Sequence, residues 1–546
     1  MRWERSAHSQ IARALAHAGV FGAACFAVPG PAIAADAVAL RGLSNAGQEA
    51  PVACAESADQ CFMLLGLTID GASAFTQADL AHLYEPYLAR TVGLDDLARI
   101  ADAITTRYRE AGYFLSRAIV PPQDAESGVA RIVVLEGRIT EIVIEGEAGA
   151  QAGAYLRGID AQPIADLRDL DRRLALASDV PGLAVRSRIE PDPNDPTRHR
   201  LVVSTEFRAI DALASIDNRG SEDAGPLQAY GRVRGNSVLF DRDQASLGVF
   251  TTPASPSDFT YIEAAYAYGF KNGARAAVAA SASRAHDGHD IASPDIGGDG
   301  QALSLRYDHP LQRGRAGGLW LGGAFDLRHA ENDWTGGGGY ADELRVASLN
   351  LRGFLNEHGH ASTVFARASF GLDILGASGR SLLRRSRYDA DGEFVTFNLH
   401  MSHYRDLGRY VGVYASIDGQ WADRPLLLSE EFSVGGQFYG RAYNPGEISG
   451  DHGLAGLVEL RAGYDPNIGP ISFLQGYLFY DTAEVWNYNT APGADELSLS
   501  SAGAGLRVSF EDWLTARLEI ARPLTRTPYE EQDKDWRQFF SLSAAY

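Results

Sequence analysis

A long loop between two expected strands carries the residues whose types are most suited to chemistry. It runs from Gly435 to Gly453, is rich in Gly, Asn and Pro, and lies between the strand-like segments Ser433-Val434 and Leu457–Leu460. At its centre, Tyr439-Gly-Arg-Ala-Tyr443 places the cation of Arg441 between aromatic side chains. Long ordered loops are usually functional. We predict that Arg441 is held inside a β-barrel by an acidic partner on a nearby strand, and that the rest of the chain supports or supplies that barrel.

A second group of polar residues has the composition of a metal site but not the setting. His286, Asp287, His289 and Asp290 lie close together in the sequence, within an expected outer loop where solvated polar residues are normal. The chain shows no Ser/His/Asp order with supporting motifs, no phosphate-cradling loop and no convincing pair of catalytic carboxylates. We therefore predict no enzymatic activity, no cofactor and no metal.

Composition narrows the class of protein. The chain has 546 residues and a formal charge of −21, which argues against nucleic acid as a partner and against a polybasic membrane anchor. It contains 58 Gly, 23 Tyr and 23 Phe but only three Met, which is typical of a turn-rich, aromatic β protein.

The first 34 residues have the pattern of a secretory signal peptide. Three arginines come first, an apolar stretch from Ala14 to Val28 follows, and Ala32-Ile33-Ala34 is a small-x-small cleavage site. The alternative, an internal core helix, is disfavoured because Pro29 and Pro31 break the segment where a peptidase needs an extended chain. The rest of the chain has no apolar run of 18 or more residues, which leaves a secreted protein, a periplasmic protein or a β-barrel.

Cysteine usage agrees with export. Cys25 would leave with the signal, and Cys54 and Cys61 would then remain as a pair in an oxidising compartment. A disulfide closing so short a loop would contribute roughly 2 to 3 kcal/mol in the chain-entropy model. Two free thiols are the alternative, since a metal site needs more ligands than these two.

Two small modules of the order strand, helix, helix, strand, strand follow. In the first, Thr76 and Asp79 form a capping-box start, a longer helix begins at Leu94, and Gly112 ends it. The apolar face of that helix is expected to comprise Leu97, Ile100, Ala101, Ile104 and Tyr108. The second module repeats the order, with strands expected at 142–145, 183–189 and 201–205 and helices at 152–158 and 164–177.

Three fragments of the first module carry a specific resemblance. Tyr108-Arg-Glu-Ala-Gly112-Tyr113, Val120-Pro-Pro122-Gln123-Asp124 and Leu135-Glu136-Gly137 resemble the signature of a polypeptide-transport-associated (POTRA) domain of the two-partner secretion type. Ser178-Asp-Val-Pro181-Gly182 resembles the matching site of a second such domain. The resemblance implies POTRA modules over 61–138 and 139–208 that bind an extended client by strand addition. The residues implied in client binding are Gly112, Tyr113, Pro122, Gln123, Gly137, Pro181 and Gly182. A rigid spacer without client contact is the alternative.

From Ala209 to Tyr546 the sequence alternates apolar and polar residues between Gly-, Asn- and Asp-rich turns. In Leu319–His329, for example, Leu321 and Leu327 share one face while Asp326 lies on the other. An ionisable row opposite an apolar row is typical of a water-filled barrel in lipid, whereas a soluble sandwich would need a partner sheet for every apolar face. The last strand resembles the insertion signal of outer-membrane barrels through Phe540, Leu542 and Tyr546, with Tyr in place of the usual final Phe.

Taken from about residue 61 to 546, the chain resembles the outer-membrane transporter (TpsB) of two-partner secretion, the hemolysin secretion and activation family. The resemblance implies α+β POTRA modules followed by a transmembrane antiparallel β-barrel of about 16 strands. Loop 435–453 then corresponds to an extracellular loop that folds into the lumen. Its usual Val-Arg-Gly-Tyr motif appears here as Gly440-Arg441-Ala442-Tyr443, and the family's Phe-x-Asp-x-Gly motif appears as Phe479-Tyr480-Asp481-Thr482-Ala483.

By this resemblance Arg441 meets Asp481 in the lumen, where a guanidinium can engage a carboxylate through two hydrogen bonds. Ala442 and Ala483 replace glycines of the family motifs, which puts the local backbone conformation in question because Ala tolerates positive φ poorly. An exposed Arg441 in a surface loop is the alternative. Asp217-Asn218-Arg219-Gly220 resembles the turn after the first barrel strand, and we assign it no chemistry.

The same resemblance implies partners and a location. The barrel would lie in the outer membrane of a Gram-negative bacterium, with periplasmic POTRA modules, surrounding outer-membrane lipid and insertion by the barrel assembly machinery. Its client would be a secreted exoprotein of the TpsA type, a β-helical hemolysin or adhesin, captured unfolded. Residues 35–60 show no convincing amphipathic helix, so the plug helix of the family is expected to be short or missing. An assembly or insertion factor of the same superfamily, or a passive porin, are the alternative functions.

Overall fold

The computed structural model describes residues 61–124, 127–220, 225–257, 259–287, 296–334, 339–379, 384–466, 468–488, 495–511 and 513–546. The expected signal peptide, segment 35–60 and Cys54 lie outside these residues, whereas Cys61 is disulfide-bonded. The chain divides into two compact units: one holds the paired small modules up to Phe207, and the other holds residues 208–546 together with 179–182. In the described part of the chain, no helix is long and apolar enough to cross a membrane.

The first module places two helices against a three-stranded sheet in which β2 and β5 are parallel and β4 is antiparallel to β5. A separate pair, β1 and β3, lies at its start. Its elements are β1 (Phe62–Met63), β2 (Gly66–Asp70), α2 (Gln77–Tyr84), η1 (Glu85–Tyr87), β3 (Thr91–Val92), α3 (Leu94–Glu110), β4 (Arg117–Ile119) and β5 (Val129–Leu135).

The helix signals of this module are confirmed. Thr76 accepts the backbone N–H of Asp79, and the Asp79 carboxylate accepts the Thr76 N–H at 2.9 Å, so the capping box is complete. The five residues expected on the apolar face of α3 are all buried. Gly112 adopts φ +100 directly after α3, a conformation that glycine reaches without strain.

The second module repeats the arrangement with longer strands, and its sheet order β6-β8-β7 matches β2-β5-β4. Its elements are β6 (Arg138–Gly146), α4 (Gly149–Leu156), α5 (Leu167–Ser178), β7 (Leu183–Pro191) and β8 (Arg198–Phe207). Ile139, Leu156, Leu170, Leu201 and Val203 form its core. α5 begins at Leu167, three residues later than the sequence indicates. Just before it, the Asp166 carboxylate accepts the Arg168 N–H at 2.8 Å, and the Ala165 N–H donates to the first module.

Two motif glycines of the first module hold that junction. The carbonyl of Gly137 accepts the N–H of Ala165 at 2.8 Å, and the carbonyl of Gly112 accepts the N–H of Leu167 at 2.9 Å. A Cβ at Gly137 would lie 2.4 Å from the carbonyl oxygen of Leu115, so no larger residue fits there. The glycines of the POTRA signature therefore join one module to the next.

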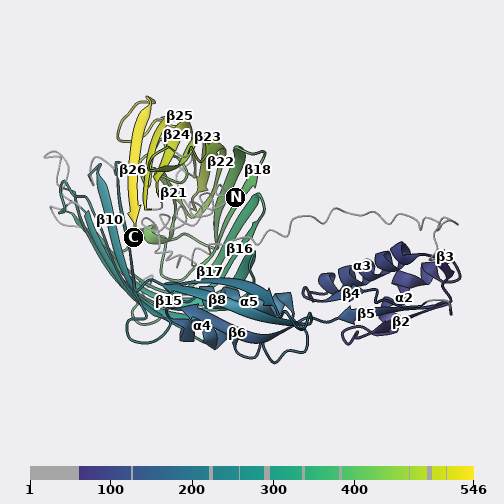
Figure 1. Cartoon of the computed structure of the whole chain (residues 1–546). Coiled ribbons are helices and arrows are strands. Elements are labelled where there is room, and N and C mark those ends of the chain that lie inside the picture. Colours follow the sequence, from purple (N-terminus) through teal and green to yellow (C-terminus); the bar gives the residue numbers. More distant parts are fainter. Residues whose placement is uncertain are drawn as a thin grey trace. The chain divides into compact units, whose positions relative to one another are not determined.

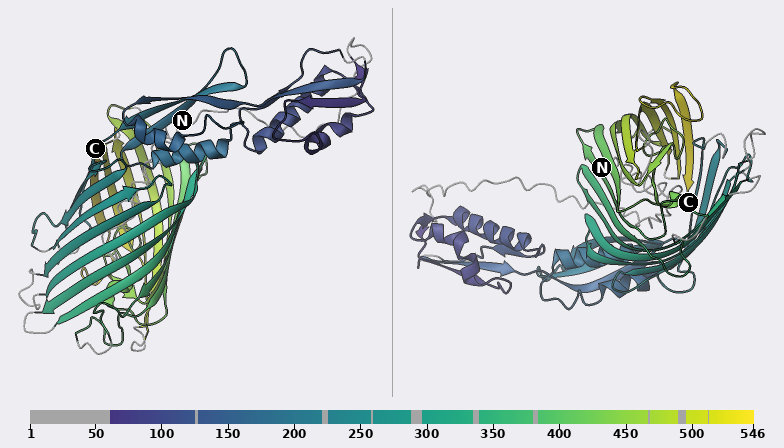
Figure 2. Two further views of the ribbon diagram at one scale, coloured as in Figure 1. Left: turned by 90° about the horizontal axis from the view of Figure 1, so that it is seen from below. Right: turned by 180° about the vertical axis from the view of Figure 1, so that it is seen from behind.

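The second unit is a closed antiparallel barrel of 16 strands (Figures 1 and 2). Neighbouring strands follow the chain order, and β26 pairs with β9 to close the ring. Figure 2 shows the strands side by side around the wall, tilted against the barrel axis. The strands are β9 (Ile210–Asp217), β10 (Gln228–Asn236), β11 (Asp243–Thr251), β12 (Phe259–Gly269), β13 (Arg275–Asp287), β14 (Ile296–Arg313), β15 (Gly317–Trp334), β16 (Gly339–Glu357), β17 (His360–Gly371), β18 (Val395–Asp406), β19 (Val411–Ala422), β22 (His452–Tyr464), β23 (Ile471–Trp486), β24 (Glu496–Phe510), β25 (Leu514–Pro523) and β26 (Arg537–Ala545).

Burial in the barrel is the reverse of burial in a soluble domain. On β15, Leu321 is 45% exposed, whereas Asp326 on the opposite face of the strand is 4% exposed. On β25, Leu518 is 60% exposed and Glu519 is 3% exposed. Apolar side chains thus point outward and polar ones inward, as lipid outside and a polar lumen inside require. The alternation expected from the sequence is confirmed.

Glu136, in the Leu-Glu-Gly motif, ties the first module together. Its carboxylate accepts hydrogen bonds from the Ser73 hydroxyl at 2.5 Å, the Ala74 N–H at 2.9 Å and the Tyr108 hydroxyl at 2.7 Å. Burial alone would raise the pKa of Glu136, but these hydrogen bonds outweigh it and hold the pKa below its ordinary value of 4.5.

A pH dependence of the first module follows. Because the folded-state pKa of Glu136 is lowered, its contribution to stability is present above the unfolded pKa and disappears as the pH falls through the folded one. We expect the first module to become sensitive to pepsin as the pH falls below 4.5. Glu136→Gln should be sensitive already at higher pH and lose most of that dependence.

Glu206→Gln, at an exposed carboxylate in the same unit, is the matched control and should follow the parent protein. Identical pH profiles for Glu136→Gln and the parent would contradict the assignment.

Candidate functional site in the barrel lumen

The loop between β19 and β22 folds back inside the barrel. After β19 the chain passes through η2 (Leu428–Glu430) and β20 (Phe432–Val434), and returns through β21 (Ile448–Gly450), which pairs with β20. Figure 1 shows β21 within the ring of strands. Of the segment between them, Ala442 is fully buried and Tyr443 is 1% exposed. The exposed surface loop considered as the alternative is therefore excluded for Arg441, which is 5% exposed.

The tip of the loop holds its own shape through backbone hydrogen bonds. The N–H of Gly435 donates to Tyr439 at 3.2 Å, that of Gly436 donates to Tyr443 at 3.0 Å, and that of Tyr443 donates to Gly440 at 2.8 Å. Gly440 adopts φ +70, whereas neither Ala442 nor Ala483 has positive φ. The two alanines therefore need no unusual conformation, because the positive-φ positions of this tip fall on Gly435, Gly436 and Gly440.

The guanidinium of Arg441 pairs with two glutamates of the barrel wall. It lies 2.6 Å from Glu459 on β22 and 3.3 Å from Glu519 on β25. The side chains of both glutamates are at most 1% exposed, and the Arg441 side chain is 6% exposed. Its central carbon also lies 4.7 Å from the ring centre of Phe479. The carboxylates and the aromatic face together offset the desolvation of this buried cation.

Asp481 binds the loop through the backbone, which corrects the expected side-chain pair. Its carboxylate accepts the N–H of Gly440 at 2.8 Å and the N–H of Arg441 at 3.4 Å, and it also accepts the Ser501 hydroxyl at 2.7 Å. In the β22–β23 register, Glu459 faces Phe479 and Leu457 faces Asp481. Asp481 therefore lies two residues along β23 from Phe479, and the guanidinium of Arg441 lies at the level of Phe479 and Glu459.

The two glutamates serve five arginines. Besides Arg441, Glu459 pairs with Arg461 at 2.6 Å and Arg507 at 3.1 Å, and Glu519 pairs with Arg219 and Arg517. Tyr477 donates to Glu519 at 2.6 Å and accepts from Arg517 at 2.8 Å. We call Arg219, Arg441, Arg461, Arg507, Arg517, Glu459 and Glu519 the arginine network.

Aromatic rings compensate the excess of positive charge in the arginine network. Each of its arginines lies over a ring: Arg219 over Phe539 at 4.1 Å, Arg441 over Phe479 at 4.7 Å, Arg461 over Tyr414 at 4.1 Å, and Arg507 and Arg517 over Tyr477 at 3.9 and 5.6 Å. Glycines of β24 make room for two of these rings, since a Cβ at Gly503 would lie 2.6 Å from Phe479 and one at Gly505 would lie 2.2 Å from Tyr477.

The turn to which the sequence assigned no chemistry contributes to this site. Arg219 pairs with Glu519 and donates to the Arg441 carbonyl at 3.2 Å, so the assignment was wrong. Asn218 clamps the closing strand, because its side-chain oxygen accepts the Phe540 N–H at 2.7 Å and its nitrogen donates to the Gln538 carbonyl at 3.0 Å. The Asp-Asn-Arg-Gly pattern was the available signal, but it also fits an ordinary turn.

The loop has a second attachment, at η2. Glu430 pairs with Arg328 of β15, and both side chains are at most 15% exposed. Beside them Asp326 accepts the Ser304 hydroxyl at 2.5 Å and lies 3.4 Å from both Arg328 and Arg367. These four charges balance one another. The three that belong to the wall lie on β15 and β17 rather than on the strands that bind Arg441.

A third attachment joins the base of the loop to two other loops. The fully buried carboxylate of Asp451 accepts the Arg387 guanidinium at 2.7 Å, the Leu426 N–H at 2.7 Å and the Tyr488 N–H at 2.8 Å. Arg387 also donates to the Tyr488 carbonyl at 2.7 Å. No local sequence pattern indicates this contact, because Arg387 lies in a polar loop far from Asp451 along the chain.

The motif residues expected to bind a client make contacts within the fold. The Gln123 side chain both donates to the Arg131 carbonyl at 2.9 Å and accepts the Arg131 N–H at 2.6 Å. If the pairing of β4 with β5 continued, Pro121 would stand opposite Arg131, but Pro121 has no N–H to donate. The Gln123 side chain makes these hydrogen bonds in its place. Tyr113 packs against Phe75 and Tyr108 in the core, and exposed Pro122 precedes Gln123. Gly182, after Pro181, adopts φ +77 and accepts the Arg208 N–H at 2.8 Å.

The cluster at His286 lies outside the part of the chain that the structure describes, since His289, Asp290 and the side chains of His286 and Asp287 are not among the described residues. Within the described residues no group of three His, Cys, Asp or Glu could hold a metal ion.

Comparison with known proteins identifies the family. The family model described as haemolysin secretion/activation protein ShlB/FhaC/HecB matches residues 201–508, and the model of the ShlB-type POTRA domain matches residues 62–137. The chain belongs to the ShlB/FhaC/HecB family. Members of this family are outer-membrane transporters of two-partner secretion, so the protein is an outer-membrane transporter that exports an exoprotein, with its POTRA module in the periplasm.

Individual relatives agree in length and fold. The heme/hemopexin transporter protein HuxB of Haemophilus influenzae is 22% identical over 460 residues, covering 82% of this chain and 80% of that one. The outer membrane transporter CdiB of Dickeya dadantii is 24% identical over 487 residues, covering 87% and 85%. The structure of CdiB from Escherichia coli superposes with a TM-score of 0.73 at 19% identity, covering 100% of this chain and 99% of that chain.

Removing one carboxylate of the arginine network should weaken the ShlB-family barrel. In Glu519→Gln, Arg219, Arg441 and Arg517 lose their shared anion and the buried positive excess grows. Breaking a buried ion pair by removing one partner costs about 3 kcal/mol or more, and the polar lumen reduces that figure. We expect the temperature at which the barrel loses its folded electrophoretic mobility to fall clearly.

Glu393→Gln removes an exposed carboxylate of the same barrel and is the control. Equal unfolding temperatures for the two variants would show that the arginine network does not stabilise the barrel.

Proposed function

We propose that the transporter captures an unfolded exoprotein of the TpsA type, a β-helical hemolysin or adhesin, with its periplasmic modules and passes it through a lumen gated by loop 435–453. The arginine network is the observation that supports a gating role for the loop. It fixes the buried tip of the loop to β22 and β25 through Glu459 and Glu519, and to the turn after β9 through Arg219. A loop held this way occupies the lumen at rest, and the client moves it by replacing its contacts.

The charged part of the loop's attachment suits a gate, while Val434, Tyr443 and Ile448 also hold the loop through an apolar cluster with the wall. Arg441, Glu430 and Asp451 each make charge-assisted hydrogen bonds, which water and an extended peptide can replace. Opening an interface made only of apolar side chains would cost more free energy, because water in the lumen does not replace apolar contacts. The ion pairs therefore specify one resting position and still permit release.

For capture, the second module offers the better strand edge. β4 of the first module spans only three residues, and the Gln123 side chain already fills the next ladder position on β5. β7 spans nine residues, lies beside α5, and pairs with β8 on one side only. We infer that an extended client adds to β7 by backbone hydrogen bonds, with little demand on its sequence.

The other face of that sheet favours the same mode. Arg188 pairs with Glu145 and Glu190, and Arg200 pairs with Glu141, at 2.8 to 3.4 Å. These side chains are about half-exposed and satisfy one another, so this part of the face is a solvated surface. The edge of β7 remains the available template.

The residues expected as the insertion signal fit a role outside the lumen. Phe540 and Leu542 point outward from β26 and are 39% and 41% exposed, and Tyr546 is 81% exposed. We propose that the barrel assembly machinery recognises this strand during insertion. The matching family model is that of secretion proteins, so the alternative of an assembly factor has no observation in its favour.

Replacing the cation of the gate tests the proposal. We expect Arg441→Ala to insert normally, to secrete little exoprotein, and to show altered single-channel conductance in planar bilayers. Arg441→Lys should fall between the two proteins, because an ammonium keeps the positive charge but has no planar face to stack on Phe479.

Arg405→Ala, at an exposed arginine of β18, is the control and should secrete at the parent level. Normal secretion by Arg441→Ala would remove the loop from the transport mechanism.

A photo-crosslinking side chain tests the capture site. Placed at Ser187, on the free edge strand β7, it should form an adduct with the secreted exoprotein in cells that express both. Placed at Ser204, on the central strand β8, it should form little. Adducts of equal yield at the two serines, or none at Ser187, would rule out strand addition at this edge.

A further inference from the structure

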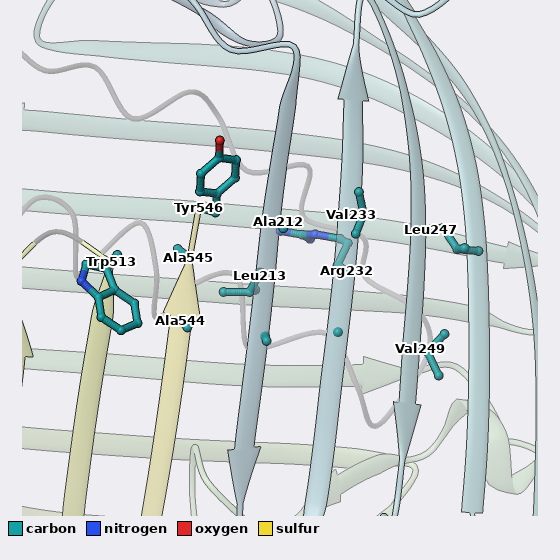
Figure 3. Close-up of a pocket in the computed structure, with 12 residues that line it drawn as sticks. Ala212, Leu213, Arg232, Val233, Leu247, Val249, Trp513, Ala544, Ala545 and Tyr546 are labelled. Atoms are coloured by element: carbon teal, nitrogen blue, oxygen red, sulfur yellow. The ribbon is translucent and has the colours of Figure 1, made fainter.

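A shallow apolar trough lies on the outer surface of the barrel where the last strand meets the first (Figure 3). Small residues form its floor: Ala212 and Ala214 of β9, Gly231 of β10 and Ala544 of β26. Larger residues rise beside them. Trp513 and Tyr546 flank the floor on one side, and Val233, Leu247 and Val249 flank it on the other, as Figure 3 shows.

The trough faces the surroundings of the barrel and has almost no polar surface. Val233, Leu247 and Trp513 are 51% to 55% exposed, which places them on the same outward face as the other exposed apolar residues. A Cβ built on Gly231 meets nothing within 4 Å, so the space above the floor is open. This face of a ShlB-family barrel contacts the hydrocarbon of the outer membrane.

Chain direction sets its depth in the membrane. β9 begins at Ile210, immediately after the periplasmic modules, so Ala212 and Ala214 lie near the periplasmic end of the barrel. Trp513 in the turn between β24 and β25, and the C-terminal Tyr546, lie at the same end. Trp and Tyr are enriched where hydrocarbon meets headgroups, which places the trough in the inner leaflet.

The junction of β9 and β26, which lies behind the trough, has the shortest ladder of paired residues in the described barrel. β26 and β9 pair over five residues each, whereas every other pair of neighbours in the described barrel pairs over at least eight. Beyond the ladder, the Tyr546 N–H donates to Ala212 at 2.9 Å, and the Ala545 N–H donates to Trp513 at 2.7 Å. The small floor residues leave this junction without the bulky side chains that cover other parts of the wall.

We propose that the trough is a binding site for one acyl chain of an inner-leaflet phospholipid. The chain lies along Ala212, Ala214, Gly231 and Ala544 and covers the junction of β9 and β26 from outside. Continuity with the lipid-facing belt and the apolar lining specify a hydrocarbon, and the periplasmic end specifies the leaflet. An unfolded client travels through the polar lumen and does not reach this surface.

Photolabelling tests the proposal on the full-length protein. The protein is placed in nanodiscs of phosphatidylethanolamine and phosphatidylglycerol that contain phosphatidylethanolamine with a diazirine on one acyl chain. After irradiation, peptides containing residues 212–214, 231–233 and 544–546 should carry more label than the rest of the outward face. Gly231→Leu, whose side chain fills the open space, should lose most of that enrichment.

Gly476→Leu is the matched control, because Gly476 on β23 also has nothing within 4 Å of a Cβ but lies outside the trough. It should keep the parent pattern of label. Ala214→Leu fills the floor from the neighbouring strand and serves as a second variant should Gly231→Leu not fold. Label spread evenly around the belt, unchanged label in both trough variants, or a dimer in which a second copy covers the trough would each overturn the proposal.

Discussion

Burying a guanidinium inside a membrane barrel imposes the constraint on which the rest of this structure depends. The side chain of Arg441 is 6% exposed, so its charge needs carboxylates, hydrogen-bond acceptors and polarisable neighbours close by. Glu459 and Glu519 supply the carboxylates and Phe479 supplies an aromatic face. Because those three residues lie on β22, β25 and β23, a single loop residue ties together one sector of the wall.

The constraint extends to residues that never touch the loop. Two glutamates with five arginines leave positive charge in excess, and the rings of Tyr414, Tyr477 and Phe539 offset it at the faces of the remaining arginines. Those rings in turn need space, which Gly503 and Gly505 provide. This sector of the lumen is therefore densely packed, with charged and aromatic side chains beside an apolar cluster. The opposite wall holds the loop through the balanced group around Glu430 and Arg328, and Leu426 and Leu427 pack there with Leu344 and Val346.

Much of the fold could be predicted from the sequence, because local patterns decide it. The capping box at Thr76, the apolar face of α3 and the alternation in β15 and β25 depend on near neighbours in the chain. The partners of Arg441 could not be predicted, because they depend on register. Asp481 lies in a motif and was chosen, yet the row facing the guanidinium is set by how β22 pairs with β23 and β24 with β25. The roles of Arg219 and Arg387 could not be predicted for the same reason, because their contacts join segments far apart in the sequence.

The motif glycines of the first module make contacts that the sequence does not reveal. Gly112 and Gly137 were interpreted as part of a client site, but their carbonyls hold the start of the next module, and Gln123 completes a ladder that Pro121 interrupts. A resemblance to a family identifies such residues in the sequence, but their role in the fold follows only from the contacts that they make. The long free edge of β7 carries no motif, since strand addition uses the backbone.

The most direct test of the central claim is a pair of double-mutant cycles on the free energy of pore opening, taken from single-channel open probability. One cycle combines Arg441→Met with Glu459→Gln, and the other combines Arg441→Met with Asp481→Asn. Because the guanidinium reaches Glu459 while Asp481 binds backbone N–H groups that the substitution keeps, the first cycle should show strong coupling and the second near-additivity. Additivity with Glu459 together with strong coupling to Asp481 would contradict the account.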